Sequence, residues 1–207
     1  AGVVVGKFGT SSVSPAEFKD ICEKTSQKTL RDNGLKKTTS YSKASIKVIS
    51  GKLLKSKLEI TKALDYIKNT NKRLVFTNGC FDIIHTGHVR YLNKARSIGD
   101  FLLVAINDDD SVKRLKGNSR PINNLENRAV VLNGLSSVDL VVTFNEDTPE
   151  KLIEFLKPDT LVKGGDYKEE EIVGADFVKR SGGNVVVLPF EKGNSTTNIL
   201  KKINNKE

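Results

Sequence analysis

From Arg73 onward, short continuous apolar runs alternate with segments of helical periodicity, and this alternation restricts the fold more than any other feature of the chain. Apolar runs without polar alternation are typical of strands whose two faces are both covered by helices. Strand–helix alternation favours parallel strands joined by right-handed crossovers. The predicted strands are 74–77, 101–106, 140–144, 160–162 and 185–188, and the predicted helices are 88–98, 124–135, 149–157, 169–181 and 196–204. We therefore predict an α/β domain over 72–207, with a doubly wound, parallel five-stranded sheet and an N-terminal appendage.

The segment ahead of this domain is strongly basic. Between Lys28 and Lys57 there are nine basic residues and one acidic residue, which account for most of the net charge of +9. The stretch is rich in Ser, Thr, Asn and Lys, which is typical of a solvated linker. Polyanion binding is the alternative, but aromatic platforms are almost absent, with Tyr41 alone inside the stretch. Ser56 and Glu59 then form a capping-box pattern that predicts a helix start.

Several classes of protein are excluded by composition. No uncharged apolar run approaches the roughly 18 residues that a membrane helix needs, so we expect no membrane partner. Cys22 and Cys80 could form at most one bridge, so the chain is no disulfide scaffold. No signal peptide is visible, and a reduced, cytoplasmic location is expected. Because the chain has no Met and begins with Ala1, we expect the true start to lie elsewhere.

The loop after the first core strand holds both histidines of the chain, His85 and His88, in one four-residue window. Gly87 permits a tight turn, and His88 opens the next helix, so a separation of three residues puts both imidazoles on one side. The helix N-terminus beside them offers free N–H groups, which suit phosphate. Surface or capping histidines are one alternative. A zinc site with Cys80 is another, although the spacing fits no familiar zinc pattern.

Three further loops follow strand ends and carry groups that suit phosphate. Neither a G-x-x-x-x-G-K-[ST] nor a G-x-G-x-x-G motif is present, so a P-loop NTPase and a dinucleotide oxidoreductase are unsupported. A cationic cluster, Lys113–Gly117, follows the second strand, with Arg128 just inside the next helix. Residues 163–167 contain paired glycines that allow close ligand approach. Residues 193–198 offer hydroxyls at the start of the last helix. Each is also explained by an ordinary charge run, turn or cap.

The residues around the histidines resemble the signature of the HxGH nucleotidyltransferase superfamily, and 195–197 resemble its second signature. The longer strings TNGCFDIIHTGHVRYL, KRLKGNSRPIN, FNEDTPEKLI, LVKGGDY and GNSTTNI are similar to the adenylyltransferase domain of the bifunctional heptose kinase/adenylyltransferase family of bacterial lipopolysaccharide synthesis. The first residues, AGVVVGKFGTSSVSPAEF, resemble the end of a ribokinase-like kinase. The expected division is a kinase remnant at 1–27, a basic linker at 28–55 and a nucleotidyltransferase domain at 56–207.

The resemblance implies a Rossmann-like nucleotidyltransferase fold and a reaction. ATP and D-glycero-β-D-manno-heptose 1-phosphate would give ADP-D-glycero-β-D-manno-heptose and pyrophosphate, with Mg²⁺. Catalytic roles are implied for His85, His88, Lys116 and Arg128. Nucleotide binding is implied for Thr77, Asn78, Gly79, Cys80, Phe81, Gly87, Lys113, Ser195, Thr196 and Thr197. Substrate binding is implied for Asp82, Lys163, Gly164 and Asp166, and metal binding for Asp109. The expected partners are a kinase domain of the same or a longer chain and further copies of the chain, with no nucleic acid.

Other functions compete with this one. A glycerol-3-phosphate-type cytidylyltransferase would use the same chemistry with another base and acceptor. A non-catalytic nucleotide sensor would bind without turnover. An RNA-binding protein would use the basic stretch, with a steep dependence of binding on salt. Sugar kinase activity is not expected of this chain, because the segment before residue 30 lacks the catalytic carboxylate and anion hole of such a kinase.

Overall fold

The computed structural model describes residues 53–165, 167–189, 196, 199–200 and 203. The chain divides into two compact units, 1–42 and 43–207, and every described residue belongs to the second. The predicted kinase remnant, nearly all of the predicted linker and most of the predicted last helix therefore lie outside the described residues.

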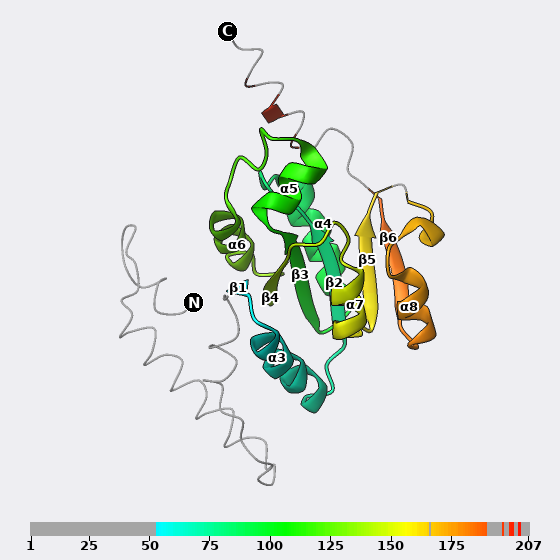
Figure 1. The fold of residues 1–207 in the computed structure, drawn as a ribbon. Helices are drawn as coiled ribbons and strands as arrows, with labels where there is room; N and C mark the ends of the chain where they lie inside the picture. Colours follow the sequence, from blue (N-terminus) through cyan, green and yellow to red (C-terminus); the bar gives the residue numbers. More distant parts are fainter. Residues whose placement is uncertain (1–52, 166, 190–195, 197–198, 201–202, 204–207) are drawn as a thin grey trace, which may run out of the picture. The chain divides into compact units, whose positions relative to one another are not determined.

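A parallel sheet of six strands, in the order β1-β4-β3-β2-β5-β6, forms the centre of the described unit (Figure 1). Its five longer strands confirm the prediction. They are β2 (Leu74–Gly79), β3 (Phe101–Asn107), β4 (Leu140–Phe144), β5 (Thr160–Gly164) and β6 (Asn184–Leu188).

The sixth strand, β1 (Leu53–Leu54), was not predicted and corrects the end of the linker at residue 55. It pairs with β4 through Leu53 opposite Val141 and Leu54 opposite Val142. Two leucines in a lysine-rich stretch are too few to form a periodic pattern. The edge of β4 and the apolar core supply the pairing and the burial that local sequence does not, and Leu54 is buried.

Helices cover both faces of the sheet, as predicted for a doubly wound domain (Figure 1). One face packs against α4 (Thr86–Ser97) and α6 (Leu125–Asn133). The other packs against α3 (Lys57–Asn69), α7 (Glu150–Leu156) and α8 (Ala175–Arg180). The predicted capping box starts α3, because the Ser56 side chain accepts from the Glu59 N–H and Glu59 returns to the Ser56 N–H. None of the helices in the described ranges has the length and apolarity to cross a bilayer.

Two predictions for helices are wrong in detail. Most of the predicted loop Lys113–Gly117 belongs to a helix, α5 (Asp109–Lys116), because Asp108 caps its first turn and the charges complement the helix dipole. The predicted helix 169–181 is divided into a 3₁₀ turn, η1 (Glu169–Glu171), and α8. Gly174 has a φ of 85° between them, a left-handed conformation that ends helical continuity.

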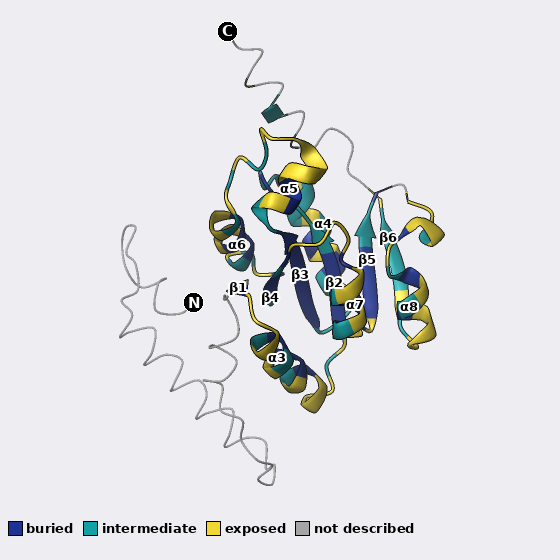
Figure 2. Cartoon of the chain, in the orientation of Figure 1, coloured by how far each residue is buried: buried dark blue, intermediate teal, exposed yellow. Residues whose placement is uncertain are grey.

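The order of the strands reverses its direction between β2 and β5. From β2 the chain winds through β3 to β4 on one side, and then crosses to β5 and β6 on the other. In open parallel sheets, ligands bind beyond the carboxyl ends of strands at such a reversal. In Figure 2 β3 is buried along its whole length and most residues of β2, β4 and β5 are also buried, so the sheet is a firm support for the loops that follow it. The histidine loop follows β2.

We predict that a chain beginning at Leu53 folds without the preceding residues, because β1 starts there and the described core is continuous from that point. A melt followed by circular dichroism should show one cooperative transition. A chain beginning at Ser56 keeps the capping box but lacks the buried Leu54. It should melt at a lower temperature, because the apolar contact at the β4 edge is lost. Loss of cooperative melting in the chain from Leu53 would contradict the prediction.

Candidate active site

The two histidines stack at the start of α4, as the spacing predicts. His85 is the N-cap residue with extended backbone, and α4 begins at Thr86. The centroids of the His85 and His88 rings lie 3.8 Å apart, with 24° between the planes. Backbone N–H groups of the first turn of α4 have no partners within the helix. The site therefore combines two imidazoles with the positive end of a helix dipole.

Phe81 packs against the His88 ring of this pair. Its ring lies 5.2 Å from the His88 ring at 57°, and its side chain is buried. A Cβ on Gly79 would approach the Phe81 ring to 3.0 Å, so a side chain at position 79 would displace the ring. Phe81 also holds a φ of 46°, which is uncommon for a bulky residue and marks local backbone strain. The structure thus assigns Phe81 to packing under the histidines.

Both imidazoles are uncharged at neutral pH in the absence of ligand. Burial lowers the pKa of His88 to about 4, with a further contribution from the neighbouring His85 that a hydrogen bond with the Ile83 backbone opposes. Burial also lowers the pKa of His85. The buried Nδ1 atom of each ring has no hydrogen-bond partner among the described residues. A phosphate would supply the partner and favour the charged form.

The Ile83 carbonyl links the histidine loop to the second signature. It accepts a hydrogen bond from the Thr196 hydroxyl at 3.3 Å. This contact joins residues far apart in the sequence and places Thr196 beside the loop that precedes α4. Ser195 and Thr197 lie outside the described residues, as does Asp166.

We predict that His88 makes stability depend on pH. The folded-state pKa of about 4 lies below the ordinary value of 6.5, so the unfolded chain binds more protons between these values. The stabilising effect of neutral His88 is present above about pH 6.5 and decreases as the pH falls toward 4. Urea unfolding from pH 4 to 7.5 should show a smaller loss of stability in His88→Gln than in the unchanged protein. Equal slopes in both proteins would contradict the assignment.

Arg128 reaches the site from α6, but its side chain is fully buried and engaged by protein groups. Its guanidinium donates to the Cys80 carbonyl at 2.7 Å, the Asn123 carbonyl at 3.0 Å and the Asp109 carboxylate at 2.7 Å. The roles implied for Arg128 in catalysis and for Asp109 in metal binding stay predictions; in the structure the two side chains pair with each other. Both hold the loop after β2 against α5 and α6.

The Asp82 side chain is likewise buried and engaged by protein groups. Its side chain is 1% exposed and accepts from Arg120 Nε at 2.5 Å. The backbone N–H groups of Ile122 and Asn123 also donate to it, at 2.9 and 2.8 Å. Burial raises the pKa of Asp82, but these two N–H groups and the guanidinium outweigh it and hold the pKa below its usual value. Asp82 thus ties the 120–123 loop to the histidine loop, a role different from the substrate contact implied by the resemblance.

The side chain of Thr77 is engaged by Tyr91 of α4. It is buried within β2, and its hydroxyl shares a hydrogen bond of 2.6 Å with the Tyr91 hydroxyl. The Tyr91 hydroxyl also donates to the Val162 carbonyl, and burial raises the pKa of Tyr91 to about 12. Thr77 therefore connects α4 to the sheet through this side-chain hydrogen bond.

The lysines of α5 differ from one another. Lys113 pairs with Asp110 at 3.0 Å, and both side chains are largely exposed. Lys116 is exposed and has no hydrogen bond or ion pair within the described ranges. It is nevertheless close enough to lower the pKa of Cys80 electrostatically, although burial raises that pKa more. Among the described residues, Lys116 thus has no counter-ion and lies close enough to Cys80 to act on it electrostatically.

Three members of the site were not predicted from the sequence: Arg120, Asn123 and Tyr91. Their hydrogen bonds join residues separated by 38, 41 and 14 positions, so no local periodicity indicates them. Arg120 and Asn123 do lie within the string KRLKGNSRPIN. That string was the signal in the sequence that could have identified these two residues.

The described residues do not form a cage for a resident metal ion. No group of three or more His, Cys, Asp or Glu side chains suited to a metal occurs among them. The nearby carboxylates of Asp82 and Asp109 are paired with arginines. Mg²⁺ usually keeps several waters and binds through one or two carboxylates together with substrate phosphates.

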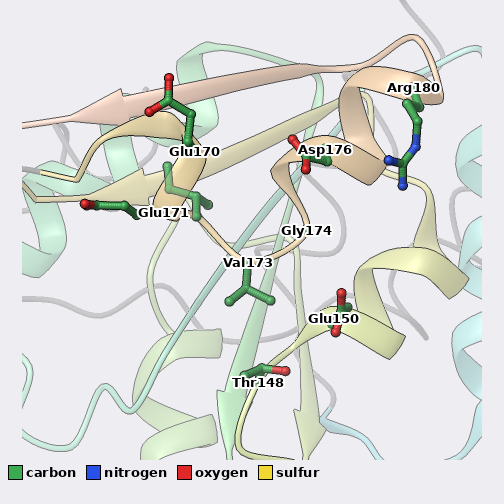
Figure 3. A pocket seen from close by; sticks show the side chains of 9 residues that line it. Thr148, Glu150, Glu170, Glu171, Val173, Gly174, Asp176 and Arg180 are labelled. Atoms are coloured by element: carbon green, nitrogen blue, oxygen red, sulfur yellow. The ribbon is translucent and has the colours of Figure 1, made fainter.

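A separate cavity of about 360 Å³ lies between the start of α7 and the η1–α8 segment (Figure 3). Four carboxylates line it, against one arginine, Arg180. Such a lining repels phosphate, and none of the histidine-loop residues takes part. The candidate active site is therefore the surface beyond the ends of β2 and β5.

The sequence model described as Cytidylyltransferase-like matches residues 76–202, and the chain belongs to this family. The match includes every described site residue discussed above. It agrees with the fold and with the paired histidines at a helix start.

Relatives of the chain carry one shared name. The chain is 50% identical over 203 residues to "Bifunctional protein HldE" of Haemophilus influenzae, 51% to that of Histophilus somni and 49% to that of Actinobacillus succinogenes. Each match covers 98% of this chain and 38% of the relative, so the chain spans well under half of those proteins.

Two solved structures are also similar. A lipopolysaccharide core biosynthesis protein from Thermoplasma volcanium is 28% identical, with a TM-score of 0.49, over 59% of this chain and 99% of its own. A pantoate-beta-alanine ligase from Francisella tularensis is 18% identical, with a TM-score of 0.46, over 75% of this chain and 77% of its own.

Proposed function

We propose that the chain is an adenylyltransferase that makes ADP-D-glycero-β-D-manno-heptose and pyrophosphate from ATP and D-glycero-β-D-manno-heptose 1-phosphate, for the lipopolysaccharide core. The observation that carries this proposal is the stacked pair of neutral histidines at the start of α4. Identity of about half to the HldE relatives supports the choice of adenylyl transfer to a heptose phosphate.

The reaction is a direct displacement. A phosphate oxygen of the heptose 1-phosphate forms a bond to the α-phosphorus of ATP. The bond from that phosphorus to the oxygen bridging to the β-phosphate breaks, and pyrophosphate leaves with the electron pair. Such a transfer needs positioning and neutralisation of charge and forms no covalent intermediate with the protein.

The histidines act where charge develops. Their ring nitrogens and the first-turn N–H groups of α4 donate to the oxygens of the α-phosphate, whose charge increases in the transition state. Lys116, exposed and unpaired among the described residues, neutralises the phosphates. Mg²⁺ bound to the triphosphate would supply further neutralisation of charge. Arg128 and Asp82 keep the surrounding loops in place.

Partners are part of the same proposal. The relatives are longer and are named bifunctional, which supports a kinase domain as a neighbour in a complete protein. We also propose a cytoplasmic location and a homo-oligomer.

A coupled assay of pyrophosphate release tests the proposal. ATP with the heptose 1-phosphate should give steady release, and ATP with glucose 1-phosphate should give little. CTP with glycerol 3-phosphate, the pair used by a glycerol-3-phosphate-type cytidylyltransferase, should give none. Release only with CTP would favour that enzyme. Calorimetric binding of ATP without release from any pair would favour a nucleotide sensor.

A further inference from the structure

The hydroxyl of Tyr91 joins three elements of the fold beside the histidine pair. Tyr91 lies in α4, three residues after His88 and therefore on the same side of the helix. Its hydroxyl is 2.6 Å from the Thr77 hydroxyl of β2 and 3.2 Å from the Val162 carbonyl of β5. These two strands are neighbours at the point where the strand order reverses. One side chain thus connects the helix that carries His88 to both strands at that reversal.

The directions of these hydrogen bonds follow from the single proton of a phenol. Tyr91 donates it to the Val162 carbonyl, so the Thr77 hydroxyl donates to the Tyr91 oxygen. Burial raises the pKa of Tyr91 to about 12, so the phenol keeps its proton at neutral pH. Tyr91 is therefore not a base for the reaction. Its hydroxyl supplies a directional link between α4 and the sheet.

Apolar packing alone does not fix how α4 is rotated on the sheet. Leu92 and Ala95 pack in an apolar cluster with the strands, but hydrophobic contacts are not directional. An ion pair of 2.7 Å between Arg96 and Asp139 holds the far end of the helix. A hydrogen bond restricts both distance and angle. Of these two polar links, the one through Tyr91 is the nearer to the histidines and fixes the rotation of α4 there.

We propose that Tyr91 is a positioning residue for adenylyl transfer, which holds α4 so that His85 and His88 meet the α-phosphate. This inference rests on the proposed function. Tyr91 acts through the helix, whereas Phe81 supplies the ring that packs against His88. A displacement of about 1 Å in groups that stabilise a transition state can cost about 10²-fold in rate. Loss of the Tyr91 hydroxyl should therefore lower turnover although both imidazoles are still present.

Steady-state pyrophosphate release with ATP and the heptose 1-phosphate tests the effect on turnover. Tyr91→Phe should lower kcat about 10- to 100-fold and change KM for ATP by less than about threefold, because misplaced donors affect the transition state more than the ground state. The matched control is Tyr66→Phe in α3, on the other face of the sheet, where the lost hydroxyl has no hydrogen-bond partner among the described residues. It should leave both constants unchanged. An unchanged kcat in Tyr91→Phe, or a raised KM alone, would overturn the proposal.

A loss of stability is separated from a loss of position by a second control. Tyr91→Phe should lower the melting temperature by about 2–4 °C, as expected for one hydrogen bond in a protein of this size. Ile153→Val removes one buried methyl group from α7, on the other face of the sheet, and should lower it by a similar amount. Its kcat should stay near that of the unchanged protein. Equal losses of kcat in the two variants would assign the effect to stability and overturn the positioning role.

A spectroscopic measurement tests the position of the histidines without turnover. The chain has two histidines, so its imidazole protons give two sets of NMR signals. The rings are stacked 3.8 Å apart, and each shifts the signals of the other through its ring current. In the ligand-free protein Tyr91→Phe should move both sets, and Tyr66→Phe should move neither. Unmoved signals in Tyr91→Phe would overturn the positioning role alone, whereas absence of pyrophosphate release from the unchanged protein would overturn the proposed reaction.

Discussion

His85→Ala and His88→Ala should each lower kcat about 10²- to 10³-fold, equivalent to about 2.7–4 kcal/mol of transition-state stabilisation. Charge on the α-phosphate oxygens develops only during the transfer, so donors aimed at them affect turnover more than the affinity for ATP. The two rings are stacked, with their centroids 3.8 Å apart. The double variant should therefore lose less than the product of the single effects, because the pair acts as a unit.

Steady-state pyrophosphate release and calorimetric ATP affinity check this prediction together. Asn93→Ala, on an exposed position of the same helix, is the matched control and should keep turnover within about twofold. Melting temperatures should show that the histidine variants remain folded, because the pair lies in a loop and a first turn. Turnover within about threefold of the unchanged protein, at equal ATP affinity, would remove the histidines from the catalytic machinery.

Local spacing is what made the histidine pair predictable. Two side chains three residues apart at a helix start are neighbours whatever the rest of the fold does. The same holds for the Ser56–Glu59 capping box and for the apolar runs of β2 to β6. Each is a property of a short segment, and the structure confirms each.

The roles of Arg128 and Asp82 could not be predicted in the same way. Sequence shows the charge of a side chain but not its burial or its partners. The counter-ion of Asp82 is Arg120, 38 residues away in the chain, and that of Arg128 is Asp109, 19 residues away. In the sequence, an arginine near phosphate-binding motifs is interpreted as a phosphate-binding residue. The fold shows that the Arg128 side chain has no exposed surface. Strand β1 was not predicted for a related reason, because its pairing partner, β4, is distant in the sequence.

Asp82→Ala should destabilise the protein by about 3–5 kcal/mol, because it removes one partner of a buried ion pair. The Arg120 guanidinium, 14% exposed, would lose its counter-ion, and the N–H groups of Ile122 and Asn123 would lose their acceptor. For a domain of this size the melting temperature should fall by roughly 6–20 °C. Asp82→Asn keeps an oxygen for the N–H groups and should lose less.

The matched control is Asp147→Ala. Asp147 pairs with Arg114 at 2.8 Å, but both side chains are half exposed or more, so its loss should leave the melting temperature nearly unchanged. A second measurement follows from pH. The lowered pKa of Asp82 means that its stabilising effect is present above about pH 3.8 and is lost as the pH falls through the folded-state pKa. Asp82→Asn should therefore show a weaker acid decline in stability than the unchanged protein.

The two explanations of Asp82 give opposite results, which makes the variant decisive. If Asp82 holds the 120–123 loop, the melting temperature falls, and the remaining folded protein at low temperature keeps measurable turnover. If Asp82 contacts substrate or metal, as the resemblance implies, the melting temperature stays near that of the unchanged protein while turnover is abolished. Burial of the carboxylate with three protein donors favours the first result, since its side chain has almost no exposed surface to offer a substrate or metal.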